Sequence, residues 1–248
     1  MKTKGKIILA VAAVFALLAG AAAFVAGRYY IDNRQPNFSK DYVLYVYPEM
    51  TAAQVLDSLQ AGAGTIRPKS VERVFKKMEI DQNMKPGRYV VDTTVPSIYV
   101  ARMLAYGWQT AQNMTLSGTL RAKGRIAQRI GSQMLVDSAA VAQALNDEAF
   151  LAKYGFTPEN VFALILPDTY QMYWTSSIEE IFDRFKKEYD AFWTEERLAK
   201  AKAQGLNQME VSIMASIVSG ETLKEFEYPI IAGVYLNRYK KGMKLQAD

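Results

Sequence analysis

The chain has 248 residues, of which 50% are hydrophobic and 22% charged, and it contains neither Cys nor His. This length suits one or two domains of roughly 100–200 residues each. The two absent residue types exclude a Ser-His-Asp triad, a thiol nucleophile, a disulfide, a zinc or iron–sulfur site, and lipidation of an N-terminal Cys. Acid–base chemistry must therefore come from Glu, Asp, Lys or Tyr, and we expect no metal or other cofactor.

The formal net charge of +5 lies in the N-terminal 40 residues, which hold six Lys or Arg residues and a single Asp. The remaining residues carry 24 basic and 24 acidic groups. A nucleic-acid partner is not predicted, because it would require a basic face on the folded body.

An uncharged, mostly aliphatic run extends from Ile7 to Gly27. At 1.5 Å per residue it spans about 30 Å, the thickness of a bilayer core. Three lysines precede it, which predicts a single-pass helix (1–28) in the inner (cytoplasmic) membrane, with a cytoplasmic N-terminus and a periplasmic or extracytoplasmic body. The alternative is a cleaved signal peptide, for which Ala21–Ala23 offers a cleavage site.

Residues 29–40 are polar, contain Pro36 and predict a linker. Short strands and helices then alternate over a small α/β module, 41–110. Its predicted elements are a strand at 42–47, helices from Thr51 and from Pro68, a turn at 84–87 leading into a strand, and a helix capped by Ser97.

The region 111–248 is predicted to be mainly helical, so the fold class is α+β. Pro167–Tyr170 is expected to interrupt the helices as a turn. The helical spacings cover 122–135, 138–145, 178–193, 209–222 and 229–238.

Glu221 continues an apolar stripe formed by Met214, Ile217 and Val218. A carboxylate on that stripe would be partly buried, which favours its neutral form and suits a general acid. The alternative is a Glu at a frayed helix end, with its carboxylate in solvent.

Five segments carry motifs. The most specific is ASIVSGET at 215–222, followed by IAGVYLNR at 231–238 and GMKLQAD at 242–248. KPGRY at 85–89 and LPDTY at 166–170 precede them. Together they resemble the endolytic murein transglycosylases, the YceG-like family.

This resemblance implies a membrane anchor, a LysM-like module and a catalytic region. It also implies an activity, a lytic transglycosylase that cleaves the bond between N-acetylmuramic acid and N-acetylglucosamine in nascent glycan strands and leaves 1,6-anhydromuramyl ends. The implied partners are peptidoglycan strands, the inner membrane and peptidoglycan synthases.

By this resemblance, Glu221 would first protonate the oxygen of the leaving sugar. It would then, as a carboxylate, accept the proton of the attacking C6 hydroxyl. Classical hydrolysis needs two carboxylates, whereas this internal attack needs one. Other motif positions would bind sugar, orient Glu221 or serve only in packing: Asn237, Gln246 and Asp248. Asp168 and Tyr170 would line the cleft or hold their turn.

The sequence departs from the family pattern at two places. Ser219 stands where the family usually has a first Glu, and the chain ends at Asp248, where the family continues with Pro-Thr. We therefore expect a catalytic region truncated at its C-terminus, and a cleft without one wall would leave this fragment inactive. The competing hypothesis is a non-catalytic, membrane-anchored protein that binds or scaffolds the cell wall.

Overall fold

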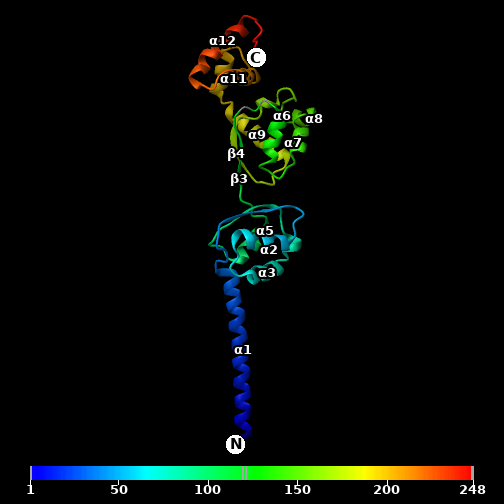
Figure 1. The fold of residues 1–248 in the computed structure, drawn as a ribbon, viewed down its shortest axis with the longest axis vertical. Helices are drawn as coiled ribbons and strands as arrows, with labels where there is room; N and C mark the ends of the chain where they lie inside the picture. Colours follow the sequence, from blue (N-terminus) through cyan, green and yellow to red (C-terminus); the bar gives the residue numbers. More distant parts are fainter. Residues whose placement is uncertain (1, 119, 121, 247–248) are drawn as a thin grey trace. The chain divides into compact units, whose positions relative to one another are not determined.

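The structure is a computed structural model that describes residues 2–118, 120 and 122–246. The chain divides into two compact units, Met1–Ala111 and Gln112–Asp248. It is mostly helical with two short antiparallel sheets, in agreement with the predicted α+β class (Figure 1).

Helix α1 (Lys2–Arg34) contains the apolar run. Its part Val11–Arg34 is long and apolar enough to cross a membrane, with a mean hydropathy of 1.9 and none of its hydrophobic window buried. The length and composition of this helix fit a membrane span and a signal sequence equally. The helix continues through Arg34, so the first half of the predicted linker at 29–40 is helical and not an extended tether.

A buried polar network explains why the helix continues. The carboxylate of Asp32 accepts hydrogen bonds from the hydroxyl of Ser70 at 2.6 Å and from the Nε of Arg73 at 3.0 Å. The Ser70 hydroxyl also lies 2.8 Å from that of Ser97, which accepts a hydrogen bond from the side chain of Asn37. The last turn of α1 is therefore fixed to the module that follows it, within the first unit.

The module is built on strands β1 (Tyr42–Val46) and β2 (Gly87–Val91), which pair antiparallel with Leu44 opposite Tyr89. The strand and helix predictions in this region are confirmed. One detail was wrong: Pro96 occupies the cap position of the last helix, and Ser97 is its first residue. The helices are α2 (Ala52–Ser58), α3 (Pro68–Lys77), α4 (Ile80–Asn83) and α5 (Ser97–Tyr106).

Local sequence accounts for the helix starts. Thr51 and Gln54 form a reciprocal capping box that satisfies two backbone N–H groups at the start of α2. Pro68 stands in the first turn of α3, where a missing N–H costs nothing. Packing of the apolar faces of these helices against the sheet buries a core that includes Val55, Leu59, Val74 and Leu104.

The second unit has its own core beneath helices α6 (Lys123–Gly131), α7 (Ser138–Ala144), α8 (Glu148–Ala152), α9 (Ile178–Phe192) and α10 (Glu195–Ala203). Aromatic rings of α9 dominate this core. Phe182 and Phe185 are fully buried, and Phe182 meets Phe150 edge-on at a centroid distance of 4.9 Å. The helices predicted at 138–145 and 178–193 are confirmed, and the one predicted at 122–135 ends at Gly131. Helices α8 and α10 were not predicted.

The predicted turn at Pro167–Tyr170 was only partly correct. Asp168 begins strand β4 (Asp168–Met172), which pairs antiparallel with β3 (Gln112–Leu116). These strands are 52 or more positions apart in sequence, as the pairing of Leu116 with Asp168 illustrates. The pairing was missed because two short polar strands have little signal until each finds its partner.

The two earlier motifs form one recurring local structure. In KPGRY, the hydroxyl of buried Tyr89 donates to the carbonyl oxygen of Lys85 at 2.8 Å. In LPDTY, buried Tyr170 donates in the same way to Leu166 at 2.5 Å. Each tyrosine is the third residue of a strand, and a proline directly precedes that strand. Burial raises the pKa of Tyr89 to about 12, so it remains a donor across the physiological range.

We expect Asp32→Ala to loosen the junction between α1 and α3. Two donors would lose a shared acceptor, and Arg73, which is 32% exposed, would recover part of its solvation. The local opening free energy should fall by about 1–2 kcal/mol, which is roughly a tenfold faster hydrogen exchange of the amides at 30–34. The control is Glu49→Ala on the exposed surface of the same unit. Equal exchange in wild type and Asp32→Ala would contradict this prediction.

Candidate functional site

The residues of the C-terminal motifs lie on a helical hairpin made of α11 (Gln208–Glu221) and α12 (Tyr228–Lys240). Asn207 and Glu210 form a capping box at the start of α11, and Pro229 stands in the first turn of α12. The helices share a small core of buried residues, with further partly buried apolar side chains around it. The buried members are Met214, Val218 and Tyr235.

Glu221 is the last residue of α11 and is exposed. The place of Glu221 on the apolar stripe predicted partial burial. This burial is absent, because the helix and its stripe both end at Glu221. Its carboxylate is nevertheless held in place: the hydroxyl of Tyr235, from α12, donates to Oε1 of Glu221 at 2.7 Å. Tyr235 is itself only 8% exposed, so a buried ring orients an accessible carboxylate.

A second tyrosine of α12 closes the other end of the hairpin. The hydroxyl of Tyr239 donates to Oε1 of Glu210 at 2.8 Å. The backbone N–H of Asn207 and this hydroxyl hold the pKa of Glu210 below its ordinary value. Tyr235 and Tyr239 are four residues apart, so they lie on one face of α12. Each donates to a carboxylate of α11.

The loop between the helices is closed by its own side chains. The hydroxyl of Thr222 donates to Oε2 of Glu227 at 2.6 Å and accepts from the backbone N–H of Lys224 at 3.1 Å. The residue that follows Glu221 is thereby fixed, which limits the freedom of the carboxylate next to it.

Ser219, at the position of the usual first Glu, is exposed and donates to the carbonyl of Ser216 in its own helix at 3.1 Å. Residues two apart on an α-helix point about 200° away from each other. A Glu at position 219 would therefore not share a face with Glu221.

Among the residues that the structure describes, none of the other predicted site residues forms a hydrogen bond with Glu221. Asn237 is exposed on α12, and Gln246 accepts a hydrogen bond from Arg238 at 2.6 Å. Asp168 is exposed on β4, whereas Tyr170 is buried and holds its turn. Asp248 lies outside the described residues.

Gln246 has a left-handed backbone, with φ of 51°, and the segment before it folds back on α12. Arg238 fixes this return, because its Nε also donates to the carbonyl of Lys244 at 3.0 Å. The Arg of the IAGVYLNR motif and the Gln of the GMKLQAD motif are therefore direct partners. The sequence motifs identify both segments but do not predict this contact.

Sequence reasoning missed Tyr235. The residue stands inside the IAGVYLNR motif, and its aromatic type at an apolar helix position was the available signal. That signal predicts packing. Only the pairing of α11 with α12 reveals that the hydroxyl reaches Glu221.

The model of the YceG-like family matches residues 44–248, which is most of the chain. The chain belongs to the YceG-like family. The match begins inside β1 and includes the rest of the first unit and the whole second unit, with the hairpin that carries Glu221.

Two curated relatives, each named endolytic murein transglycosylase, come from Streptococcus pneumoniae strains D39 and R6. Each is 24% identical over 95% of this chain and 47% of its own length. The chain thus spans about half the length of these curated relatives.

A YceG-like protein from Listeria monocytogenes has a similar crystal structure, with a TM-score of 0.51 and 19% identity. The similarity covers 84% of this chain and 73% of the Listeria chain. At this identity, the likeness establishes a shared fold and nothing about chemistry.

Proposed function

We propose that this chain carries the catalytic site of an endolytic murein transglycosylase, with Glu221 as its acid and base. The observation that carries the proposal is the Tyr235–Glu221 hydrogen bond at 2.7 Å, within the two motifs that mark the family resemblance. The names of the curated relatives support peptidoglycan as the substrate class.

The chemistry needs one group that first donates and then accepts a proton. Neutral Glu221 protonates the glycosidic oxygen as the bond to the muramyl anomeric carbon breaks. The resulting carboxylate takes the proton of the C6 hydroxyl as that oxygen attacks the same carbon, which leaves a 1,6-anhydromuramyl end. Exposure leaves the carboxylate within reach of a polymer, and Tyr235 keeps it aimed.

Other residues have proposed supporting roles. Asn237 and Asp168 are exposed. The amide of Asn237 can donate to and accept from sugar hydroxyl and acetamido groups, and the carboxylate of Asp168 can accept from them. Gln246 is oriented by Arg238, and Asp248 continues the same motif. For Tyr170 we propose only the positioning of its turn, since its hydroxyl is already bonded to Leu166.

We also propose that α1 anchors the protein in the inner membrane, with its N-terminus in the cytoplasm and the chain that follows α1 outside. The apolar window of α1 is wholly unburied, and lysines precede it. Strands β1 and β2 pair with each other and enclose helices α2, α3 and α4 in sequence, which supports a LysM-like module that binds glycan. Peptidoglycan synthases, which produce the glycan, are proposed partners.

The prediction of an incomplete cleft also stays a proposal. Several large apolar side chains of the hairpin region are exposed, as a site lacking a wall would leave them: Ile213, Leu223, Phe226, Ile230, Val234 and Met243. Activity should therefore be assayed both in this chain and in any longer protein that carries it.

Glu221→Gln should abolish release of anhydromuramyl products from unsubstituted glycan strands, because the amide can neither donate the proton nor accept one. The rate should fall by at least about 10³-fold, measured by mass spectrometry of the products. The matched control is Glu225→Gln, an exposed Glu in the adjacent loop. Unchanged product release by the Glu221 variant would favour the non-catalytic, wall-binding hypothesis.

Tyr235→Phe should lower kcat by roughly 10–100-fold with little change in KM, since it removes the hydrogen bond that orients Glu221. Tyr239→Phe is the matched control, one turn further along α12. If both variants lose activity equally, Tyr235 acts through the stability of the hairpin alone.

Ser219→Glu should leave activity intact or raise it, because the new side chain points away from Glu221 and meets solvent. The same product assay measures this. A loss of activity would mean that the motif has been matched to the wrong register.

A further inference from the structure

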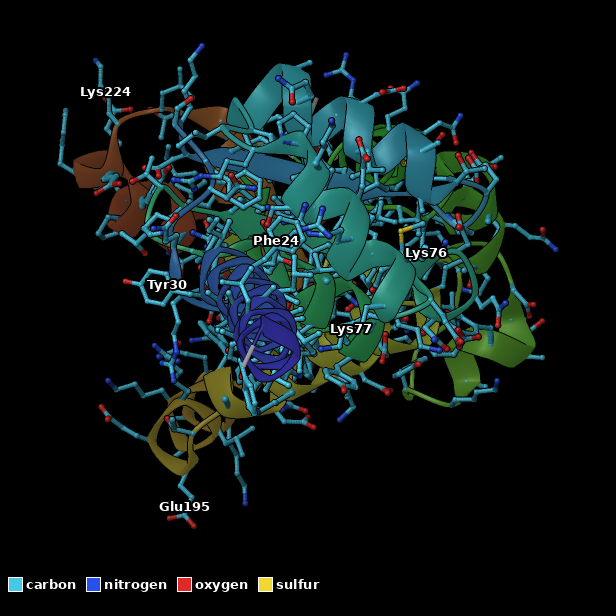
Figure 2. The ribbon with its side chains drawn as sticks, turned by 90° about the horizontal axis from the view of Figure 1, so that it is seen from below. Phe24, Tyr30, Lys76, Lys77, Glu195 and Lys224 are labelled. Atoms are coloured by element: carbon cyan, nitrogen blue, oxygen red, sulfur yellow. The ribbon has the colours of Figure 1, made fainter. Side chains whose placement is uncertain are left out.

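A cluster of cationic side chains surrounds the point where α1 meets the first unit. Lys69, Lys76 and Lys77 are exposed along α3, and we call these three lysines the α3 basic face. Arg34 is exposed at the end of α1. Figure 2 looks at the chain from below and labels Lys76 and Lys77 to the right of α1, with Tyr30 to its left.

The α3 basic face has a fixed place relative to α1. Asp32 of α1 bonds to Ser70 and Arg73 of α3, so α3 is attached to the last turn of the helix. A flexible linker would leave α3 free to turn away from a membrane. Here the contact is part of the folded unit.

Aromatic residues mark where the bilayer surface would lie. Tyr29 and Tyr30 are 62% and 57% exposed, and they follow the apolar run directly. Tyrosines at the end of a membrane span sit at the level of the lipid headgroups. Asp32 comes two residues later, a rise of about 3 Å along the helix. The attachment of α3 is therefore at the headgroup level.

The local balance of charge favours an anionic surface. Asp32 is engaged with Arg73, and the other acids on or next to α3 are Glu72 and Glu79. Glu72 lies three residues after Lys69 and four before Lys76, so it is flanked by lysines on its own stripe. Two more cationic side chains flank these elements in sequence, since Arg34 ends α1 and Arg67 directly precedes α3.

We propose that the α3 basic face binds the anionic phospholipid headgroups of the membrane in which α1 is anchored. The inference rests on the proposed anchoring by α1. It adds that contacts with lipid phosphates hold the first unit against the bilayer surface. Each lysine near an anionic surface contributes attraction that fades within a Debye length.

The test uses the full chain in lipid nanodiscs, with mass spectrometry to follow acylation of individual lysines. Discs of phosphatidylcholine are compared with discs that contain about one-third phosphatidylglycerol. Acylation of Lys76 and Lys77 should be several-fold slower in the anionic discs, and about 1 M NaCl should remove the difference. Lys200 and Lys202, exposed in the last turn of α10 in the other unit, are the internal control.

Variants test whether the lysines themselves select the lipid. Lys76→Gln with Lys77→Gln should lower the enrichment of phosphatidylglycerol over phosphatidylcholine around the purified protein, on the order of tenfold for two charges. Lys200→Gln with Lys202→Gln removes the same charge from an equivalent helix position and should change nothing. Both pairs are exposed, so folding is retained.

The outcomes separate this inference from the proposed anchor. If the chain fails to float with vesicles of either composition, the anchor is overturned, and the inference falls with it. If the chain floats with both and Lys76 and Lys77 react equally in both discs, only the inference is overturned. If soluble polyphosphate slows acylation in neutral discs as much as anionic lipid does, the face is a general polyanion site and the lipid assignment is wrong.

Discussion

The buried carboxylate of Asp32 is the interaction on which the arrangement of the first unit depends. It is 9% exposed, and it is satisfied only because Ser70 and Arg73 both donate to it. A carboxylate without partners would be too costly to bury there. The pairing therefore requires α1 to continue as a helix past its apolar run. It also makes α1 and the module a single folded piece, so the orientation of the module follows from that of α1.

Hydrogen bonds to carboxylates also hold the α11–α12 hairpin together. Its shared core is small, and two tyrosines of α12 add directional contacts to carboxylates of α11. Hydrogen bonds to charged groups are among the stronger ones, and they fix side-chain direction as well as packing. The result is a carboxylate at Glu221 that is open to a polymer but not free to rotate. The acid and base role that we propose for Glu221 would use that combination.

The two Pro-x-x-Tyr segments explain why motif residues need not touch substrate. Tyr89 and Tyr170 each close a turn through the carbonyl four residues earlier, and both are buried. A buried polar group must be bonded, so this hydroxyl has a structural task already. The sequence alone predicts two alternative roles for Tyr170, lining a cleft or holding a turn. A motif shows that a residue type is required at a position, but it does not show which role the residue has. The hydrogen bond to Leu166 favours the second.

The sequence by itself determined what depends on near neighbours. The capping boxes at Thr51 and Asn207, the proline at the start of α3, the strand at 42–46 and the helical stripes of α9 and α11 are all written within a few residues. The motifs likewise singled out Glu221. Only the tertiary structure decided the pairing of β3 with β4, the docking of Asp32, the exposure of Glu221 and its bond to Tyr235. Each of these depends on groups that meet only when distant segments pack, so no local pattern could specify them.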